Sequence, residues 1–432
     1  MKSRDTQACF PERRIMSINI RNNQNQKKID IFLITVMSAL VIGFIIVNLI
    51  RGDIIKPGRT VLTVSGQWEN IFDANTFNEL VSEYGKQNPK IKIIQSAAES
   101  AQPISSDIIF MNDSTLCSLI QAKKLLPLNT FIENDSDETQ WAIPLKESFD
   151  LLFYNIDLLK SAGFERPPKN RNEYLKYAKA VSAGQNSSVR GAALALSQED
   201  PYAIPREVFS WLWSAGFSVI KDNKPQIDKK ALSELFDFLK QLAESEKSEK
   251  EFLNRTINQQ IEEFSQGSLA LMIAPVQTIS VLTAKNLNFG FGITVIPGTA
   301  VPGNNKLGLS ASYTGISGTC KHKEEAWQFL SFLEEKSRSI SLMIDKQSGH
   351  VHGFFPKNRS DGTNQTENAL YDKVMDILES SVFAETLYTH PLASELDQIV
   401  REELINCIIE LTGASSAADL LQKRWFSVLE RF

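Results

Sequence analysis

Hydrophobic residues are distributed along this chain in one long block followed by many short ones. The block covers residues 31–50, contains no charged residue and has Asn48 as its only strongly polar member. A helix of this length rises about 30 Å, which is enough to cross the hydrocarbon core of a membrane. The block therefore predicts one N-terminal transmembrane helix, and residues 51–59, which include Pro57 and Gly58, read as a short linker behind it.

The charges that flank the block predict its orientation. The twenty residues before it contain five Lys or Arg, and the twenty residues after it contain three. Because basic residues favour the cytoplasmic side, we expect residues 1–30 to form a cytoplasmic arm and the body to lie on the extracytoplasmic (periplasmic) side of the cell membrane. No small-residue cleavage site follows the block, so an uncleaved anchor is the main interpretation and a cleaved segment the alternative.

After residue 60, short strand-like runs alternate with amphipathic helices. This alternation predicts an α/β fold built on a parallel sheet. The expected strands are residues 61–64, 91–94, 107–110, 289–296 and 312–316. The expected helices are residues 72–84, 173–181, 206–215, 229–245, 258–266, 324–335 and 394–411, the last with Ser394 as its N-cap.

Charge is distributed unevenly and excludes one class of partner. The first thirty residues hold seven Lys or Arg against three acidic residues, and the remainder holds 39 against 48. Nucleic-acid binding needs concentrated Lys and Arg side chains facing the phosphates. The acidic body therefore argues against a nucleic acid as the partner.

The sequence offers little chemistry of the catalytic or metal-binding kind. The four cysteines are not spaced as metal ligands, and no glycine-rich phosphate loop or nucleophile elbow is present. His350 and His352 could place two imidazoles on one face of a strand, but a polar segment without a metal is the favoured interpretation. We therefore expect no enzymatic activity, no cofactor and no metal site.

Five segments, in order along the body, resemble conserved blocks of one family. They resemble the family 1 extracellular solute-binding proteins of bacterial ABC importers, the maltose-binding-protein class. The segments are residues 106–110 (SDIIF), 152–174 (from LFYNIDLL through AG and PP to NEY), 264–273 (FSQGSLALMI), 290–298 (GFGITVIPG) and 312–332. The resemblance runs from about residue 61 to the C-terminus.

The resemblance implies a two-lobed periplasmic-binding-protein fold with a ligand cleft between the lobes. It implies crossings between the lobes near residues 148–151, 307–312 and 349–353. The first lobe would comprise residues 60–148 and 308–348, and the second lobe residues 151–306 and 353–432. In such a protein the lobes close over the ligand by a hinge motion, and the expected partners are a small-molecule ligand and ABC permease subunits.

Polar residues and one tryptophan follow the first and third expected strands. Open α/β sheets bind ligands at the carboxyl ends of their strands, although Asn, Asp and Ser in these places suit helix caps equally well. The resemblance adds residues near the crossings and from the second lobe. The expected ligand-binding residues are Trp68, Glu69, Asn70, Asn112, Asp113, Ser114, Ser148, Asp150, Trp213, Gln277 and Tyr313.

The resemblance makes a sugar or related carbohydrate the expected ligand. Many sugar binders of the family carry Gly-Pro-Trp where this chain has Ala-Pro-Val-Gln at residues 274–277. The missing tryptophan counts against an oligosaccharide, because stacking on an aromatic ring is how such ligands are held. A membrane-tethered ligand sensor or scaffold, which does not deliver to a permease, is the alternative function.

Overall fold

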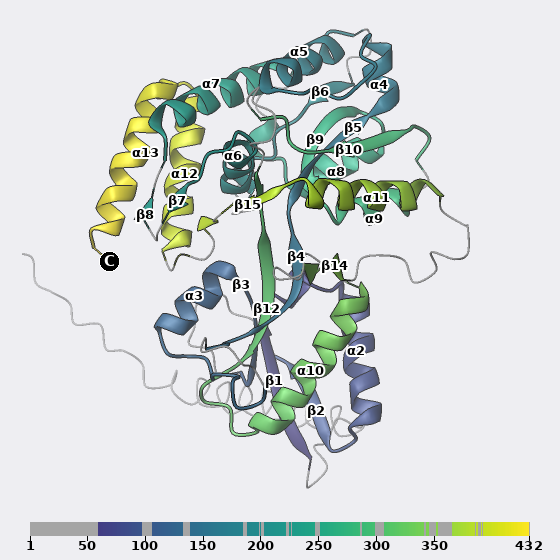
Figure 1. Ribbon diagram of the computed structural model, residues 1–432, viewed down its shortest axis with the longest axis vertical. Coiled ribbons are helices and arrows are strands. Elements are labelled where there is room, and N and C mark those ends of the chain that lie inside the picture. Colours follow the sequence, from purple (N-terminus) through teal and green to yellow (C-terminus); the bar gives the residue numbers. More distant parts are fainter. Residues whose placement is uncertain are drawn as a thin grey trace, which may run out of the picture. The chain divides into compact units, whose positions relative to one another are not determined.

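The computed structural model describes most of the chain beyond residue 58, and all of these residues except Arg59 belong to one compact unit that begins at Thr60 (Figure 1). The predicted membrane segment, residues 31–50, lies outside the described residues. Among the helices that are described, none is both long and apolar enough to span a membrane. The described residues are 59–96, 106–132, 139–184, 188–197, 199, 203–221, 224–225, 227–246, 251–285, 287–298, 306–340, 343–344, 351–352, 365–384, 386–387, 390 and 392–431.

A five-stranded mixed sheet forms the centre of the first lobe. Its strands are, in spatial order, β2 (Ile91–Gln95), β1 (Thr60–Gly66), β3 (Ile108–Asn112), β12 (Ser310–Ile316) and β4 (Ile143–Ser148). β1 pairs in parallel with β2 and β3, whereas β12 runs antiparallel to β3 and β4. The carboxyl ends of β1, β3 and β4 therefore lie at the same edge of the sheet as the start of β12.

Helices cover both faces of this first sheet. α2 (Ala74–Gln87) and α10 (Lys323–Ile340) enclose the larger core, into which β3 sends Ile108 and Phe110. α3 (Asp113–Gln121) covers the other face, where Ile109 and Met111 are buried. Successive side chains of a strand point to opposite faces, so β3 is buried on both and its first four residues are apolar.

A four-stranded sheet forms the centre of the second lobe. Its strands are, in spatial order, β10 (Phe291–Thr294), β5 (Asp150–Asn155), β9 (Leu269–Pro275) and β6 (Arg190–Ala192). β5 runs antiparallel to β10 and β9, and β6 runs parallel to β9. One core contains Leu152 and Leu271 and the opposite core contains Phe153 and Met272, so the two central strands are also buried on both faces.

Two groups of helices enclose the second sheet. One group comprises α5 (Arg171–Ser182), α6 (Ala203–Ser214), α7 (Lys229–Ser245), α12 (Ala393–Ile408) and α13 (Ala414–Leu429). The other comprises α8 (Ile257–Ser265), α9 (Thr278–Thr283) and α11 (Gln365–Glu379). The remaining short elements are η1 (Trp68–Asn70), α4 (Ile156–Ser161), β7 (Ile220–Lys221), β8 (Lys224–Pro225), η2 (Glu251–Leu253), β11 (Lys306–Gly308), β13 (Met343–Ile344), β14 (Val351–His352) and β15 (Val382–Ala384).

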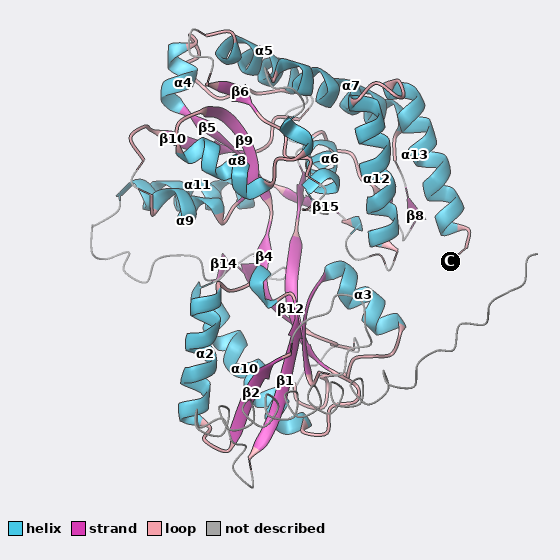
Figure 2. Ribbon diagram, turned by 180° about the vertical axis from the view of Figure 1, so that it is seen from behind, coloured by secondary structure: helices cyan, strands magenta, loops and turns pink. Residues whose placement is uncertain are grey.

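Among the described residues, two extended segments connect the lobes. β4 ends at Ser148 in the first sheet, and β5 begins at Asp150 in the second, so the chain crosses at Phe149. It returns where β11, paired with β15 of the second lobe, is followed by β12 of the first. Figure 2 shows β12 and β4 between the two groups of elements. The third expected crossing lies largely outside the described residues; β14 pairs there with β13.

Two expectations about secondary structure are wrong. The first-lobe sheet is parallel only across β2, β1 and β3, because β12 arrives from the second lobe and must run in the opposite direction. Ser394 is not an N-cap, because it lies inside α12, whose cap position is Leu392. The backbone N–H of Leu392 instead donates to Nδ1 of His390, at 3.1 Å.

Candidate functional site

A cavity of about 400 Å³ is lined by residues of both lobes. The first lobe contributes the end of β3, the start of α3, the end of β4 and the start of β12. The second lobe contributes the start of β5 together with parts of α6, α8 and α9. The volume falls in the range of sites for small organic ligands. The cavity lies beside both crossing segments, because Phe149 and Gly308 are among its lining residues.

The wall from the first lobe is a row of polar side chains on one face of the sheet. Ser312 is paired across the sheet with Asn112 of β3 on one side and with Lys146 of β4 on the other. Ser310 is likewise paired with Ser148. All five residues line the cavity. Burial lowers the pKa of Lys146, because removal of water disfavours its charged form.

Asp113 lines the cavity but also holds the first lobe together. Its carboxylate accepts the backbone N–H of Ala311 at 2.7 Å and the hydroxyl of Tyr313 at 2.9 Å. Asn112 caps α3 by accepting the N–H of Thr115 at 2.9 Å. Burial first, and the charge of Asp113 second, raise the pKa of Tyr313 well above its ordinary value. Asn112 therefore caps α3, and Asp113 holds β12 against the start of α3. These are the structural roles that the sequence analysis gave as the alternative to ligand binding.

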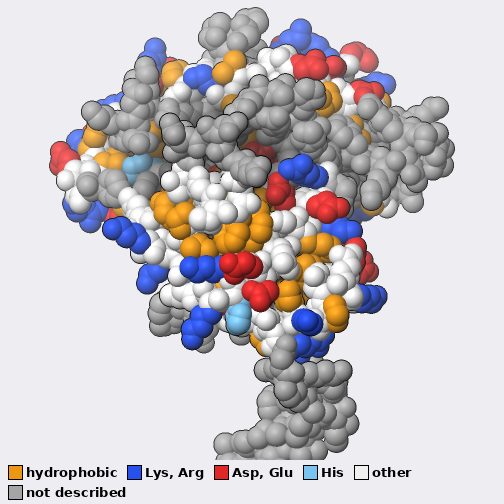
Figure 3. All heavy atoms as spheres, turned by 60° about the horizontal axis from the view of Figure 1, so that its bottom comes forward, with side chains coloured by type: hydrophobic (Ala, Val, Ile, Leu, Met, Phe, Trp, Pro, Cys, Tyr) orange, Lys and Arg blue, Asp and Glu red, His pale blue; other side chains and the backbone are white. Residues whose placement is uncertain are grey.

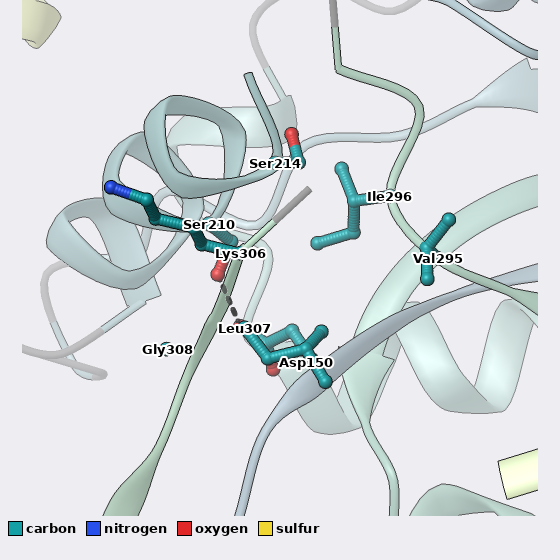
Figure 4. Close-up of a pocket in the computed structure, with 8 residues that line it drawn as sticks. All are labelled: Asp150, Ser210, Ser214, Val295, Ile296, Lys306, Leu307 and Gly308. Atoms are coloured by element: carbon teal, nitrogen blue, oxygen red, sulfur yellow. Dashed lines mark hydrogen bonds between the residues drawn. The ribbon is translucent and has the colours of Figure 1, made fainter. Parts of the chain in front are cut away.

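Asp150 forms an ion pair at the start of β5. It accepts from Nη1 of Arg206 at 3.0 Å and from the hydroxyl of Ser210 at 2.8 Å, both on α6. Figure 4 shows the bond to Ser210 beside a small hollow of about 10 Å³, room for roughly one water molecule, bordered also by Lys306 and Gly308. This carboxylate thus connects the first crossing to α6, and the crossing is anchored in the second lobe.

Gln277, the residue before the first turn of α9, forms hydrogen bonds with the end of β4. Its side-chain oxygen accepts the hydroxyl of Ser148 at 2.8 Å, and its side-chain nitrogen donates to the carbonyl of Glu147 at 2.7 Å. The hydroxyl of Ser310 donates to the carbonyl of Ser148, at 3.3 Å. A second-lobe amide therefore bridges to the end of β4, at the place where the lobes would have to bend.

The wall from the second lobe combines apolar side chains with polar ones, among them Arg206, Asn258 and Thr278. Ile257 and Ile261 are one helical turn apart on α8, and Val281 of α9 is 45% exposed beside them in the cavity lining. Trp213 also lines the cavity, but its side chain is buried. A Cβ at Gly308 would lie 1.9 Å from the Trp213 ring, so the second crossing packs directly on the indole. Only glycine allows this approach.

The structure brings six of the eleven predicted site residues into the cavity lining. They are Asn112, Asp113, Ser148, Asp150, Trp213 and Gln277. Tyr313 lies behind the polar row, with its ring among Ile109, Met111 and their neighbours. The Trp68 ring stacks on Phe77 at 4.7 Å between centroids, and Glu69 is exposed on the same turn. Asn70 and Ser114 are placed by their backbone only, in η1 and α3.

Sequence reasoning missed several lining residues. They include Lys146, Arg206, Asn258, Ser310 and Ser312, together with the apolar wall. The polar residues at alternate positions of residues 310–312 were a usable signal, because a strand shows every second side chain to one face. Within the described part of the chain no cluster of three or more His, Cys, Asp or Glu could hold a metal ion. On the face drawn in Figure 3, basic and acidic side chains are interspersed.

Comparison with solved structures shows the same fold. An ABC transporter solute-binding protein of Thermotoga lettingae, bound with α-D-tagatose, has a TM-score of 0.66 at 14% identity, covering 86% of this chain and 100% of that one. A solute-binding protein of Agrobacterium radiobacter K84 with ribitol has 0.66 at 16% identity, with coverage of 86% and 100%. One of Agrobacterium vitis S4 with D-mannitol has 0.64 at 15%, with coverage of 86% and 99%. At these identities the likeness establishes the fold alone.

Comparison of sequences identifies the family. A binding protein of Brucella abortus (strain 2308) is 23% identical over 230 residues, which are 52% of this chain and 52% of that protein. The chain thus spans about half the length of the curated relatives it matches. Residues 73–337 match the family described as bacterial extracellular solute-binding proteins, and they include both crossings and most of the cavity lining. The chain therefore belongs to the family of bacterial extracellular solute-binding proteins.

Proposed function

We propose that this chain is the extracytoplasmic binding component of an ABC importer, and that it captures a sugar, a polyol or a related small carbohydrate. The observation that carries the proposal is the cavity lined by both lobes. One wall presents a row of amide, hydroxyl and ammonium groups, and the other presents aliphatic side chains together with Arg206, Asn258 and Gln277. A carbohydrate needs both, because its hydroxyls form hydrogen bonds while its C–H surfaces contact apolar groups.

Thermal unfolding in the presence of candidate ligands tests this function. A ligand that binds only the folded protein stabilises it by RT ln(1 + [L]/Kd), about 2.7 kcal/mol at a concentration of 100 Kd. We expect at least one monosaccharide, polyol or simple derivative to raise the melting temperature in a concentration-dependent way. Amino acids and short peptides are the comparison panel. Stabilisation by a member of that panel alone would contradict a carbohydrate ligand.

We expect ligand binding to close the lobes. Asn112 and Lys146 reach the cavity from the first lobe, and Ile257 and Gln277 reach it from the second. A ligand that contacts both sets binds the closed state better, and a difference of a few kcal/mol changes the dominant population. Small-angle scattering should show a smaller radius of gyration at saturating ligand. An unchanged profile at saturation would contradict hinge closure.

We propose that residues 31–50 anchor the protein in the cell membrane. The support is the length and charge-free character of this segment. The full-length protein should stay in the membrane fraction of its native host after alkaline carbonate extraction. A mature form that begins near residue 52 and is released would contradict the anchor.

The alternative function, a tethered sensor or scaffold, draws its support from the same anchor and from the arm of residues 1–30. The ABC permease subunits are the partners that distinguish the two functions. Co-purification of the protein with a permease after mild cross-linking would favour import. Co-purification with a kinase or receptor, in the absence of permease, would favour sensing.

A further inference from the structure

Three aliphatic side chains of the second lobe line the cavity. They are Ile257 and Ile261 of α8 and Val281 of α9. The first two are one helical turn apart, so they lie on the same side of α8. α8 and α9 lie next to each other, because the ammonium group of Lys285, which follows α9, contacts the carboxylate of Glu262 on α8. The second lobe therefore presents an aliphatic patch, made of Ile257, Ile261 and Val281, to the cavity.

The packing of the second lobe does not account for this aliphatic patch. Val281 is 45% exposed, one of six large hydrophobic side chains of the described residues that are exposed. Ile257 is half-buried and belongs to none of the hydrophobic cores formed by the described residues, whereas Ile261 packs partly against one of them. Binding is favoured when apolar surface is removed from water. The patch therefore favours a ligand that has an apolar surface of its own.

The charged side chains of the described lining favour a ligand without charge. Two are acidic, Asp113 and Asp150, and two are basic, Lys146 and Arg206, so their formal charges balance. Arg206 and Asp150 also pair with each other, at 3.0 Å. A charged ligand would add an unbalanced charge to a partly buried site, which costs free energy. A neutral ligand adds none.

The groups that can form hydrogen bonds with a ligand are distributed unequally between the lobes. In the second lobe, the side-chain amide of Gln277 is held by the hydroxyl of Ser148 at 2.8 Å and by the carbonyl of Glu147 at 2.7 Å. In the first lobe, Asn112 and Ser312 are paired across the sheet and both line the cavity. A ligand hydroxyl turned toward the aliphatic patch would lose water without gaining a partner from the patch, and this weakens binding. A methyl or alkyl group in the same place has no such cost.

We propose that the ligand of this cleft is a neutral saccharide with one hydroxyl-free end, and that this end contacts the aliphatic patch. The class comprises 6-deoxy sugars, in which a methyl group replaces the hydroxymethyl group, and alkyl glycosides, in which an alkyl group caps the anomeric oxygen. This inference rests on the proposed function, which it narrows. The ligand hydroxyls face Asn112 and Ser312, and the methyl or alkyl group lies against Ile257 and Val281.

The test is a comparison of matched ligands on the full-length protein and its Val281 variants. The panel contains D-glucose, D-galactose and L-mannose, each beside its 6-deoxy counterpart and its methyl and butyl glycosides, together with the polyols ribitol and D-mannitol. Affinities come from calorimetry on the wild type, Val281→Thr, Val281→Ile and Val382→Thr. Val281→Thr keeps the size of the side chain and replaces one methyl group with a hydroxyl. Val382 is 61% exposed on β15 and is not part of the described cavity lining, so Val382→Thr makes the same change outside the site. Circular dichroism verifies the fold of each variant.

We expect a 6-deoxy sugar or an alkyl glycoside to bind about 5- to 100-fold more tightly than its parent sugar, because the parent leaves a buried hydroxyl without a partner. Val281→Thr should reduce this preference by at least about 3-fold, roughly the effect of one methyl group removed from water. Val281→Ile and Val382→Thr should preserve it. A parent sugar or polyol that binds most tightly, or a preference that Val281→Thr leaves unchanged, overturns this inference while the proposed function stands. Failure of every member to bind overturns the proposed function as well.

Discussion

Replacing Arg255 with methionine should lower the free energy of unfolding by about 3–5 kcal/mol. The Arg255 side chain is 3% exposed, and its guanidinium donates to Glu246, which is fully buried, at 2.7 Å. It also donates to the carbonyl of Leu194 at 2.9 Å and to Glu263 at 3.0 Å. The variant leaves the Glu246 carboxylate buried without its cation, which is the most costly way to break an ion pair. Urea denaturation followed by circular dichroism measures the loss.

Two further variants separate the charge effect from lost packing. Adding Glu246→Gln to Arg255→Met should recover at least about 1 kcal/mol, because the amide oxygen can still accept the Leu194 N–H. Arg338→Met breaks only the exposed pair with Glu334 and should change stability by at most about 0.5 kcal/mol. Equal losses of unfolding free energy in Arg255→Met and Arg338→Met would contradict the conclusion that the buried ion pair of Arg255 and Glu246 stabilises the fold.

The stability of the Arg255→Met variant should depend on pH in a definite direction. Burial raises the pKa of Glu246 even with Arg255 beside it, and removal of the guanidinium removes the main influence that lowers it. A carboxyl with a raised pKa in the folded state contributes stability at low pH and loses it as the pH rises. The deficit of Arg255→Met relative to the wild type should therefore be smaller at pH 5 than at pH 8.

Replacing Gly66 with alanine should destabilise the first lobe by about 2–5 kcal/mol. Gly66 ends β1 with a φ of +97°, which other residues rarely adopt, and an added Cβ would lie 2.0 Å from the carbonyl oxygen of Phe110. Either β1 and β3 separate or the turn that leads to Trp68 changes its path. Thermal unfolding and near-ultraviolet circular dichroism would detect both effects.

Gly85 provides the matched control for this substitution. It lies in α2, and a Cβ placed there meets no neighbouring atom within 4 Å. Alanine at position 85 should stabilise the protein by about 0.5–1 kcal/mol, because glycine is a poor helix residue. If both alanine variants unfold like the wild type, the close approach of β1 and β3 at Gly66 is not a constraint.

Elements with a strong local pattern were predicted well. The helix expected at residues 229–245 is α7 (Lys229–Ser245), because its apolar residues repeat at helical spacing along its whole length. The helix α13 was overlooked although its sequence carries the same signal. Its buried residues Ala417, Leu421, Trp425 and Val428 recur every three or four positions. The local pattern of α13 is therefore sufficient to predict this helix from the sequence.

Six of the eleven predicted residues line the cavity, but their contacts could not be predicted from local position in the chain. Ser148 and Gln277 are 129 positions apart in the chain, and their hydrogen bond exists only because β4 and α9 meet at the crossing. Trp68 follows the first strand as a ligand contact would, yet its ring stacks on Phe77 in the first-lobe core. Contact of Trp68 with a ligand stays a prediction. Local position cannot distinguish a side chain that turns into the cavity from one that packs behind it.

The sequence by itself determined the α/β class, seven of the helices, five of the strands and the family, because these follow from periodicity and from motifs that are local in the chain. Only the tertiary structure decided the reversed direction of β12, the pairing of Asp150 with Arg206 and the place of Lys146 in the polar wall. These features join residues that are distant in sequence. Their contacts depend on how the chain crosses between two sheets, and no local pattern encodes that geometry.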